Sequence, residues 1–132
     1  MKKRLIFPLI VLILFPLKTQ SSDVGTTSWE CPPAWNTGQH VIKPYQCIEP
    51  WYPTKAARLG IEGWAEVSFT VTRAGLVEDV IVMAEEPSGY YFYMAASSAI
   101  SRFRFRPVVV DGEALELEDA RYTFYFPTLR TQ

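Results

Sequence analysis

The most regular hydrophobic pattern in this chain is the alternation that runs from Trp64 to Thr72. Apolar side chains occupy every second position, and mostly polar side chains lie between them. The apolar set is Ala65, Val67, Phe69 and Val71. A period of two predicts a strand with one buried and one solvent-facing side.

A second strand is predicted at Leu76–Ala84, directly after this one. The turn Arg73-Ala74-Gly75 joins the two, with glycine at the position that needs a positive φ. Val77 falls out of phase with Val80, so a bulge is expected near Glu78-Asp79. The two strands therefore form a hairpin.

Helical spacing replaces the alternation between Tyr90 and Arg104. Apolar residues recur there every three or four positions and form one stripe, in which small alanines allow close packing on a sheet. The stripe is Phe92, Ala95, Ala96, Ala99, Ile100 and Phe103. A shorter helix is predicted from Pro53-Thr54 to a C-terminal cap at Gly60. Pro107 and the extended piece 108–110, with a turn at Asp111-Gly112, follow the longer helix.

The last predicted strand is Arg121–Phe126, in which Tyr122, Phe124 and Phe126 share a face. The order helix, strand, strand, helix, strand predicts an α+β two-layer sandwich, with both helices on one face of a three-stranded antiparallel or mixed sheet. A right-handed crossover places the third strand beside the first, in the order 2-1-3. The terminal strand then lies at an edge, where it can template a partner strand.

The first residues follow a different pattern, a basic start and then the apolar run Leu5–Leu17. As a helix this run spans roughly 20 Å, against about 30 Å for a bilayer core. Residues 1–21 are therefore interpreted as a secretory signal peptide that sends the rest of the chain across the membrane. The alternative is an uncleaved N-terminal membrane anchor.

The net charge of the chain becomes more negative once residues 1–21 are set aside. Four of the 13 basic residues lie there, which leaves nine basic and 14 acidic residues, a net charge of −5. A chain of that charge has no basic surface large enough for many phosphates, so nucleic acid is excluded as a partner.

Cys31 and Cys47 are the only cysteines, and an exported chain with an even count predicts one disulfide. The loop-entropy model gives such a bridge about 3 kcal/mol. It would pin an extended leader, residues 22–48, in which no strand or helix period is visible. With His40 as the only histidine, neither a metal site nor Ser-His or Cys-His catalysis is expected, so we predict no cofactor and no enzyme.

The segment Glu49-Pro50-Trp51-Tyr52-Pro53 precedes the short helix and is called the arm below. Its prolines hold two large aromatics on a stiff, extended backbone. The arm is interpreted either as a recognition element or as a cover over one end of the core.

Taken together, these features resemble the C-terminal domain of the TonB family, periplasmic energy transducers of Gram-negative bacteria. The resemblance covers about residues 49–127, with a tail at 128–132. It rests on Pro50, Tyr52-Pro53, Ala57, Gly60, Gly63, the alternation at 67–71, Gly75, Val77, Val80, Val82, Ala95-Ala96, Ala99-Ile100, Phe103-Arg104-Phe105-Arg106-Pro107, Gly112, Phe124 and Phe126.

The resemblance implies a partner and a site. Domains of this family bind the TonB box of outer-membrane receptors for siderophores and similar nutrients, as a strand added to the terminal strand, and they transmit work from the ExbB–ExbD motor. Carried onto this chain, the binding residues are Glu49, Pro50, Trp51, Tyr52, Pro53, Arg121, Tyr122, Thr123, Phe124, Tyr125 and Phe126.

Two departures keep a second hypothesis open. Residues 1–21 contain no histidine of the kind the family's membrane helix carries, and residues 22–48 form no long Pro-rich spacer. The alternative is a stand-alone periplasmic interaction or assembly module without energy transduction, including a homodimer through edge pairing.

Overall fold

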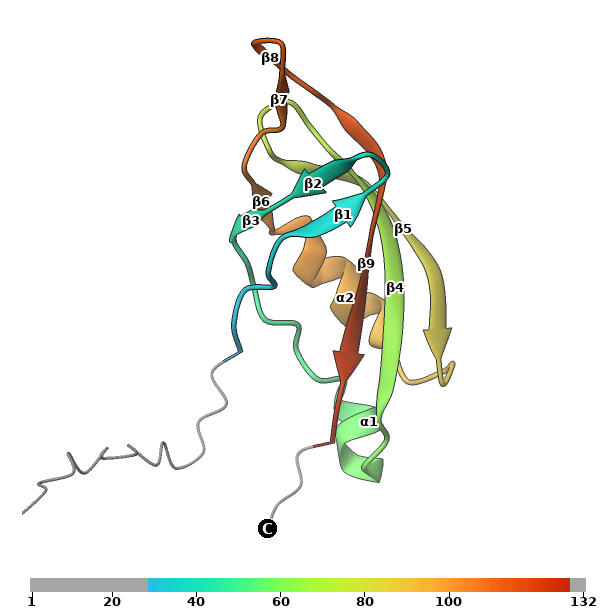
Figure 1. Ribbon diagram of the computed structural model, residues 1–132. Coiled ribbons are helices and arrows are strands. Elements are labelled where there is room, and N and C mark those ends of the chain that lie inside the picture. The colour runs from blue at the N-terminus through green and yellow to red at the C-terminus, as the bar shows by residue number, and fades with distance from the viewer. Residues whose placement is uncertain (1–28, 129–132) are drawn as a thin grey trace, which may run out of the picture.

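The computed structural model describes residues 29–128, and its centre is a three-stranded antiparallel sheet (Figure 1). The strands are β4 (Gly63–Val71), β5 (Val77–Glu86) and β9 (Leu117–Phe126), in the order β5-β4-β9. The α+β class and the predicted 2-1-3 order are confirmed, and β9 lies at an edge. β9 begins at Leu117 rather than at the predicted Arg121. Its pairing with β4 shifts register between Phe69 and Val71, and this irregularity hides the first residues of the strand from the alternation pattern. The predictions for residues 1–28 and 129–132 lie outside the described residues.

The predicted bulge on the second strand is confirmed. Asp79 has a φ of 52°, and the pairing of β4 with β5 shifts between Ser68 and Thr70. An extra residue in one strand bends it and increases its twist, so β5 is bent at this position.

The two helices meet the sheet differently. Helix α2 (Phe92–Ser101) packs along β4 and β5, whereas α1 (Thr54–Leu59) lies beyond the ends of β4 and β9 (Figure 1). Helix α2 is shorter than predicted because Tyr91 adopts a left-handed conformation before it, and the chain turns into a strand soon after Ser101. Helix α1 ends at Gly60, with a φ of 63°, as the sequence predicts.

The core lies between α2 and the inward side of the sheet. The predicted alternation on β4 and the predicted stripe on α2 supply most of its buried residues, and the aromatic rings of Phe69 and Phe105 stack at 5.7 Å. The buried apolar residues include Ala65, Val67, Phe69, Val71, Phe92, Ala95, Ala96, Ala99, Ile100, Phe103, Phe105, Phe124 and Phe126.

The described part of the leader contains short strands that the sequence pattern does not predict. Strands β1 (Trp35–Thr37) and β2 (His40–Ile42) form a hairpin, and β3 (Pro44–Gln46) pairs with β6 (Arg104–Phe105). Runs of three residues are too short for a period to be visible. The hairpin turn nevertheless carries a signal, since Gly38 occupies the first of two loop positions with a φ of 58°.

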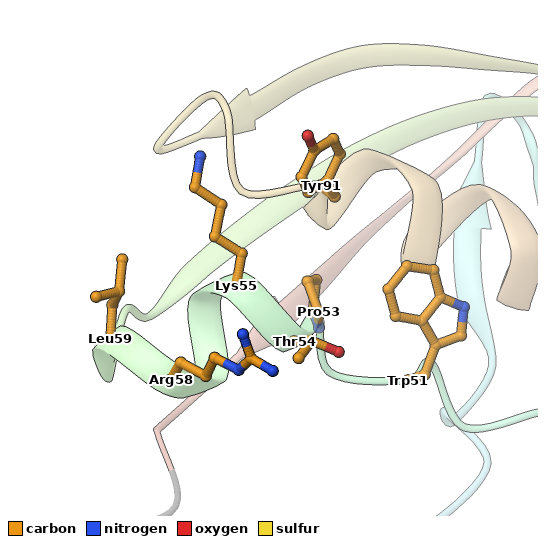
Figure 2. Close-up of a pocket in the computed structure, with 7 residues that line it drawn as sticks. All are labelled: Trp51, Pro53, Thr54, Lys55, Arg58, Leu59 and Tyr91. Atoms are coloured by element: carbon orange, nitrogen blue, oxygen red, sulfur yellow. The ribbon is translucent and has the colours of Figure 1, made fainter.

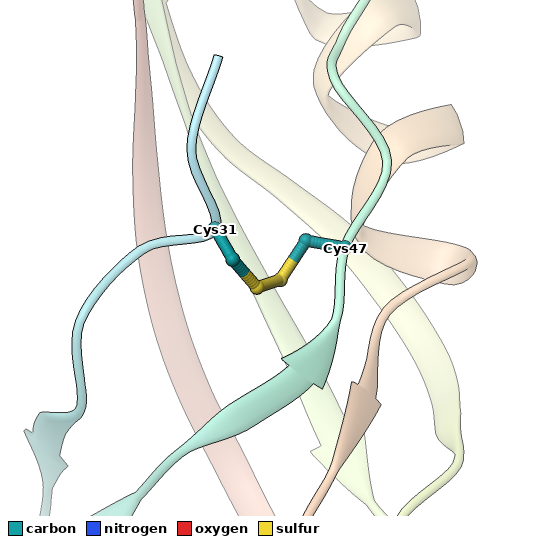
Figure 3. The surroundings of a disulfide bond; sticks show 2 residues. All are labelled: Cys31 and Cys47. Carbon is teal, nitrogen blue, oxygen red and sulfur yellow. A yellow bond between two sulfur atoms is a disulfide. The ribbon is translucent and has the colours of Figure 1, made fainter. Parts of the chain in front are cut away.

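The disulfide Cys31–Cys47 closes the leader on itself, with a Cα–Cα distance of 5.4 Å (Figure 3). It joins the residues just before the β1–β2 hairpin to those just after β3. The hairpin is therefore held at both of its ends, by the bridge and by the pairing of β3 with β6.

A small hairpin of β7 (Val109–Val110) and β8 (Glu113–Ala114) projects at the opposite end of the sheet from α1 (Figure 1). Its turn is Asp111-Gly112, the position that the sequence predicts, with positive φ at both residues. Across residues 29–128, no helix is long and apolar enough to cross a membrane.

Candidate functional site

The outer edge of β9 is the first part of the candidate site. The Arg121 carbonyl accepts a hydrogen bond from the Trp35 indole at 3.0 Å, on the side away from β4. Because backbone groups of alternate residues in a strand point to the same side, Thr123 and Tyr125 also present their N–H and C=O groups outward. Within residues 29–128, β4 is the only strand that pairs with β9. These outward groups are therefore open to an added strand.

The arm divides into an inward and an outward part. Pro53 is buried, and the Tyr52 hydroxyl donates to the carbonyl of Ile61 and lies 3.3 Å from the carbonyl oxygen of Phe126. The Tyr52 ring also meets Phe92 and Phe126 edge to face, at 6.1 and 6.0 Å. Trp51, by contrast, is 47% exposed. Tyr52 and Pro53 thus fix the arm to the core, and Trp51 is left on the surface.

A hollow with a volume of about 470 Å³ lies between the arm and the end of β9 and is called here the arm–strand hollow. It is lined by Trp29, Glu49, Pro50, Trp51, Tyr52, Tyr125, Phe126 and Pro127. Aromatic rings and prolines dominate this lining, and Tyr125 is 73% exposed. Such a surface can take an apolar side chain from a segment that pairs with the adjacent β9 edge.

A second hollow of about 560 Å³ lies on the other side of Trp51, over α1 (Figure 2). Its cationic residues are Lys55 and Arg58. The Lys55 ammonium group donates to the Gly89 carbonyl at 3.0 Å and lies 5.1 Å from the centre of the Tyr90 ring. Lys55 thus ties α1 to the loop before α2, and Trp51 forms a wall shared by the two hollows.

Polar residues gather on the solvent-facing side of β9. The Arg121 guanidinium contacts Asp119 at 3.1 Å and Glu66 at 3.5 Å, and the Ser68 hydroxyl bonds to Asp119 at 3.2 Å. The hydrogen bond from Arg121, and then the one from Ser68, lower the pKa of Asp119. This cluster holds the Arg121 side chain against the sheet, so it contacts β4 and leaves the outer edge of β9 clear.

Tyr52 and Tyr122 should make the fold sensitive to alkali. Burial raises the pKa of both phenols, and the nearby Glu62 carboxylate adds to the rise at Tyr52. Their contribution to stability is therefore fully present below about pH 10, the ordinary value for tyrosine, and is lost as pH rises through the raised values. The free energy of unfolding, measured in urea between neutral pH and pH 11, should fall as pH rises. In Tyr52→Phe it should fall with a shallower slope against pH. An unchanged slope in that variant would contradict the assignment to Tyr52.

The structure places the predicted site residues in three groups. Glu49, Pro50, Trp51 and Tyr52 come together with Tyr125 and Phe126 around the arm–strand hollow. Phe124 points into the core and Tyr122 is partly buried against it. Arg121 and Thr123 lie along the edge strand, outside the hollow.

Two residues of this region were missed, Trp29 and Trp35. Trp29 lines the hollow and packs on Phe103 at 6.2 Å, and Trp35 bonds to β9. Both belong to the leader. The Gly38 turn is the signal that could have revealed the hairpin carrying Trp35, whereas no local pattern marks Trp29.

Within residues 29–128, no group of three His, Cys, Asp or Glu side chains is placed to hold a metal ion. The arrangement of the site, an open strand edge beside an aromatic hollow, is suited to binding an extended peptide.

Residues 48–127 match the family described as Gram-negative bacterial TonB protein C-terminal. Protein TonB of Pseudomonas aeruginosa is 31% identical over 106 residues, which cover 80% of this chain and 31% of that protein. Protein TonB of Salmonella typhimurium is 34% identical over 92 residues, 68% of this chain and 35% of that protein. The chain thus spans about a third of the length of these relatives.

Two solved structures of TonB proteins are similar to this chain in fold. The solution structure of the Pseudomonas aeruginosa TonB C-terminal domain matches with a TM-score of 0.56 and 33% identity, covering 69% of this chain and 89% of that one. The TonB2 protein of Vibrio anguillarum matches with a TM-score of 0.53 and 28% identity, covering 77% of this chain and 96% of that one.

Proposed function

Since this chain belongs to the TonB C-terminal domain family, we propose that it binds the TonB-box segment of outer-membrane receptors by strand addition to β9. The family is not enzymatic, in agreement with the absence of a catalytic set in the sequence. Proteins of this family are periplasmic or anchored in the inner membrane, and they interact in general with receptors and with the ExbB–ExbD motor. For this chain, a periplasmic location after export and a role in TonB-dependent uptake of siderophores or similar nutrients are part of the proposal.

One observation carries the proposal: the open backbone groups of Thr123 and Tyr125 adjoin the arm–strand hollow. Strand addition needs an unpaired edge for affinity and a neighbouring surface that takes alternate side chains. Tyr125 contributes to both, since its backbone faces the edge and its ring lines the hollow. The arm then acts through Trp51 and Pro50, while Tyr52 keeps it in place.

The test is a titration of the ¹⁵N-labelled domain, residues 22–132, with a receptor TonB-box peptide. We expect amide shifts at Thr123, Tyr125 and the arm, and a shift of the Trp51 indole signal. The matched control is the same peptide with proline at two alternate central positions, which removes N–H donors from one edge. Shifts confined to residues away from β9 and the arm would overturn the proposal.

A second candidate follows from the same edge. An unpaired strand can pair with a second copy of itself, so a homodimer or assembly module without energy transduction also fits the open side of β9. Sedimentation over a range of concentrations distinguishes the two, because this candidate predicts association and no response to box peptides.

A further inference from the structure

We propose that the leader hairpin limits strand addition to the Thr123–Pro127 end of β9, and that Trp35 sets this limit. The inference rests on the function proposed above and concerns the length of partner segment that the site accepts.

The hydrogen bond from Trp35 lies where a longer partner strand would pair. The Trp35 indole N–H donates to the Arg121 carbonyl at 3.0 Å, and this carbonyl is the next outward acceptor along β9 after Thr123. A partner strand that ran past Thr123 would need the same carbonyl for its own N–H. Both cannot use it with good geometry, because the indole N–H already occupies the approach to this carbonyl oxygen.

Trp35 is firmly positioned there. Its ring packs on Tyr122 at 4.8 Å and on Phe105 at 5.6 Å, and both of these residues belong to the folded domain. The other strand of the hairpin, β2, ends at Ile42, which is fully buried. The disulfide Cys31–Cys47 and the pairing of β3 with β6 hold the hairpin at its ends. The hairpin is therefore a wall of the site, next to β9 (Figure 1).

The wall defines the chemistry of the partner. Within residues 29–128, Thr123 and Tyr125 are the outward-facing residues from Arg121 to the end of β9 whose carbonyls Trp35 leaves open. The pairing stretch is therefore short, and each of these two residues offers one N–H and one C=O. The remaining affinity must come from the arm–strand hollow, which lies at the other end of that stretch. The structure thus assigns as ligand an extended segment that pairs over a few residues and carries an apolar side chain toward Trp51. A long, regular strand is disfavoured.

The experiment compares two receptor box peptides, a short one that reaches Thr123 and a longer one extended by three residues that continue the strand past Arg121. In the wild-type domain we expect equal affinities, shifts at the amides of Thr123 and Tyr125, and an unchanged Trp35 indole signal. Trp35→Phe retains an aromatic ring against Tyr122 and Phe105 but removes the donor. In this variant the longer peptide should bind about five- to tenfold more tightly, the gain of roughly one hydrogen bond, while the short peptide serves as control and should be unaffected.

Reduction of Cys31–Cys47 in the wild-type domain gives a second route that leaves Trp35 intact. It loosens the hairpin and should favour the longer peptide in the same direction, by a smaller factor. This measurement also decides the case if Trp35→Phe does not fold.

The outcomes separate the two proposals. If the longer peptide already binds the oxidised wild-type domain more tightly and shifts Arg121 and the Trp35 indole, the function stands and the limit is overturned. If neither peptide binds the wild-type, variant or reduced domain, the proposed function and the inference drawn from it are both overturned.

Discussion

Replacing Gly75 with alanine is expected to destabilise the domain by about 3 kcal/mol or more. Gly75 has a φ of +81°, which costs an alanine roughly 1–2 kcal/mol. A Cβ atom at this position would also lie 2.0 Å from the Phe105 carbonyl oxygen. That carbonyl belongs to backbone, and the Phe105 N–H bonds to the Gly75 carbonyl at 2.9 Å, so the contact cannot open without loss of that hydrogen bond.

Gly112 provides a matched control. Its φ is +82°, almost the same as that of Gly75, but a Cβ there would meet nothing within 4 Å. Gly112→Ala should therefore lose only the conformational part, roughly 1–2 kcal/mol. Urea unfolding of both variants measures the difference. Equal losses at the two positions would show that the contact with Phe105 contributes nothing.

The consequence of the Gly75 substitution extends to the candidate site. Phe105 stacks on Phe69 in the core, and its strand β6 pairs with β3 of the leader. It also supports the Trp35 ring. A displaced Phe105 would therefore loosen the hairpin before the sheet itself opens, and the Trp35 indole signal should be an early reporter in the Gly75→Ala variant.

The sheet and the long helix could be predicted because their residues repeat one pattern over many positions. Ala65, Val67 and Phe69 are buried as the alternation requires, and the apolar stripe of α2 faces them. The short helix was predicted through Gly60, whose left-handed conformation ends it. In these elements the local preference and the tertiary packing agree, so a local pattern is sufficient.

The site was predictable only in part. The arm was visible from its prolines and aromatics, and the open edge followed from strand order. Trp35 could not be assigned, because its function depends on a contact with Arg121, 86 positions away. A strand of three residues leaves no period. Its packing comes from tertiary contacts with Tyr122 and Phe105, so the residues of the leader alone do not reveal the wall that they form.

Thr123→Pro is expected to weaken binding of a TonB-box peptide by about 10- to 100-fold while the domain stays folded. Proline removes the N–H of Thr123, which the direction of the Arg121 carbonyl places on the outer side of β9. Proline is tolerated in edge strands when its missing N–H faces solvent, so the pairing of β9 with β4 through Tyr122 and Phe124 is retained. The partner's carbonyl is left unsatisfied beside a pyrrolidine ring, at a cost of about 1–3 kcal/mol.

Thr123→Val is the matched control, because valine keeps the backbone N–H and the branched shape of threonine. It should bind the peptide within about twofold of the wild-type domain, since the hydroxyl lies on the sheet face rather than on the edge. Isothermal titration with one box peptide gives the dissociation constants, and amide spectra establish that both variants are folded. A folded Thr123→Pro domain with wild-type affinity would mean that the peptide does not add to this edge, since strand pairing at Thr123 cannot survive the loss of its donor.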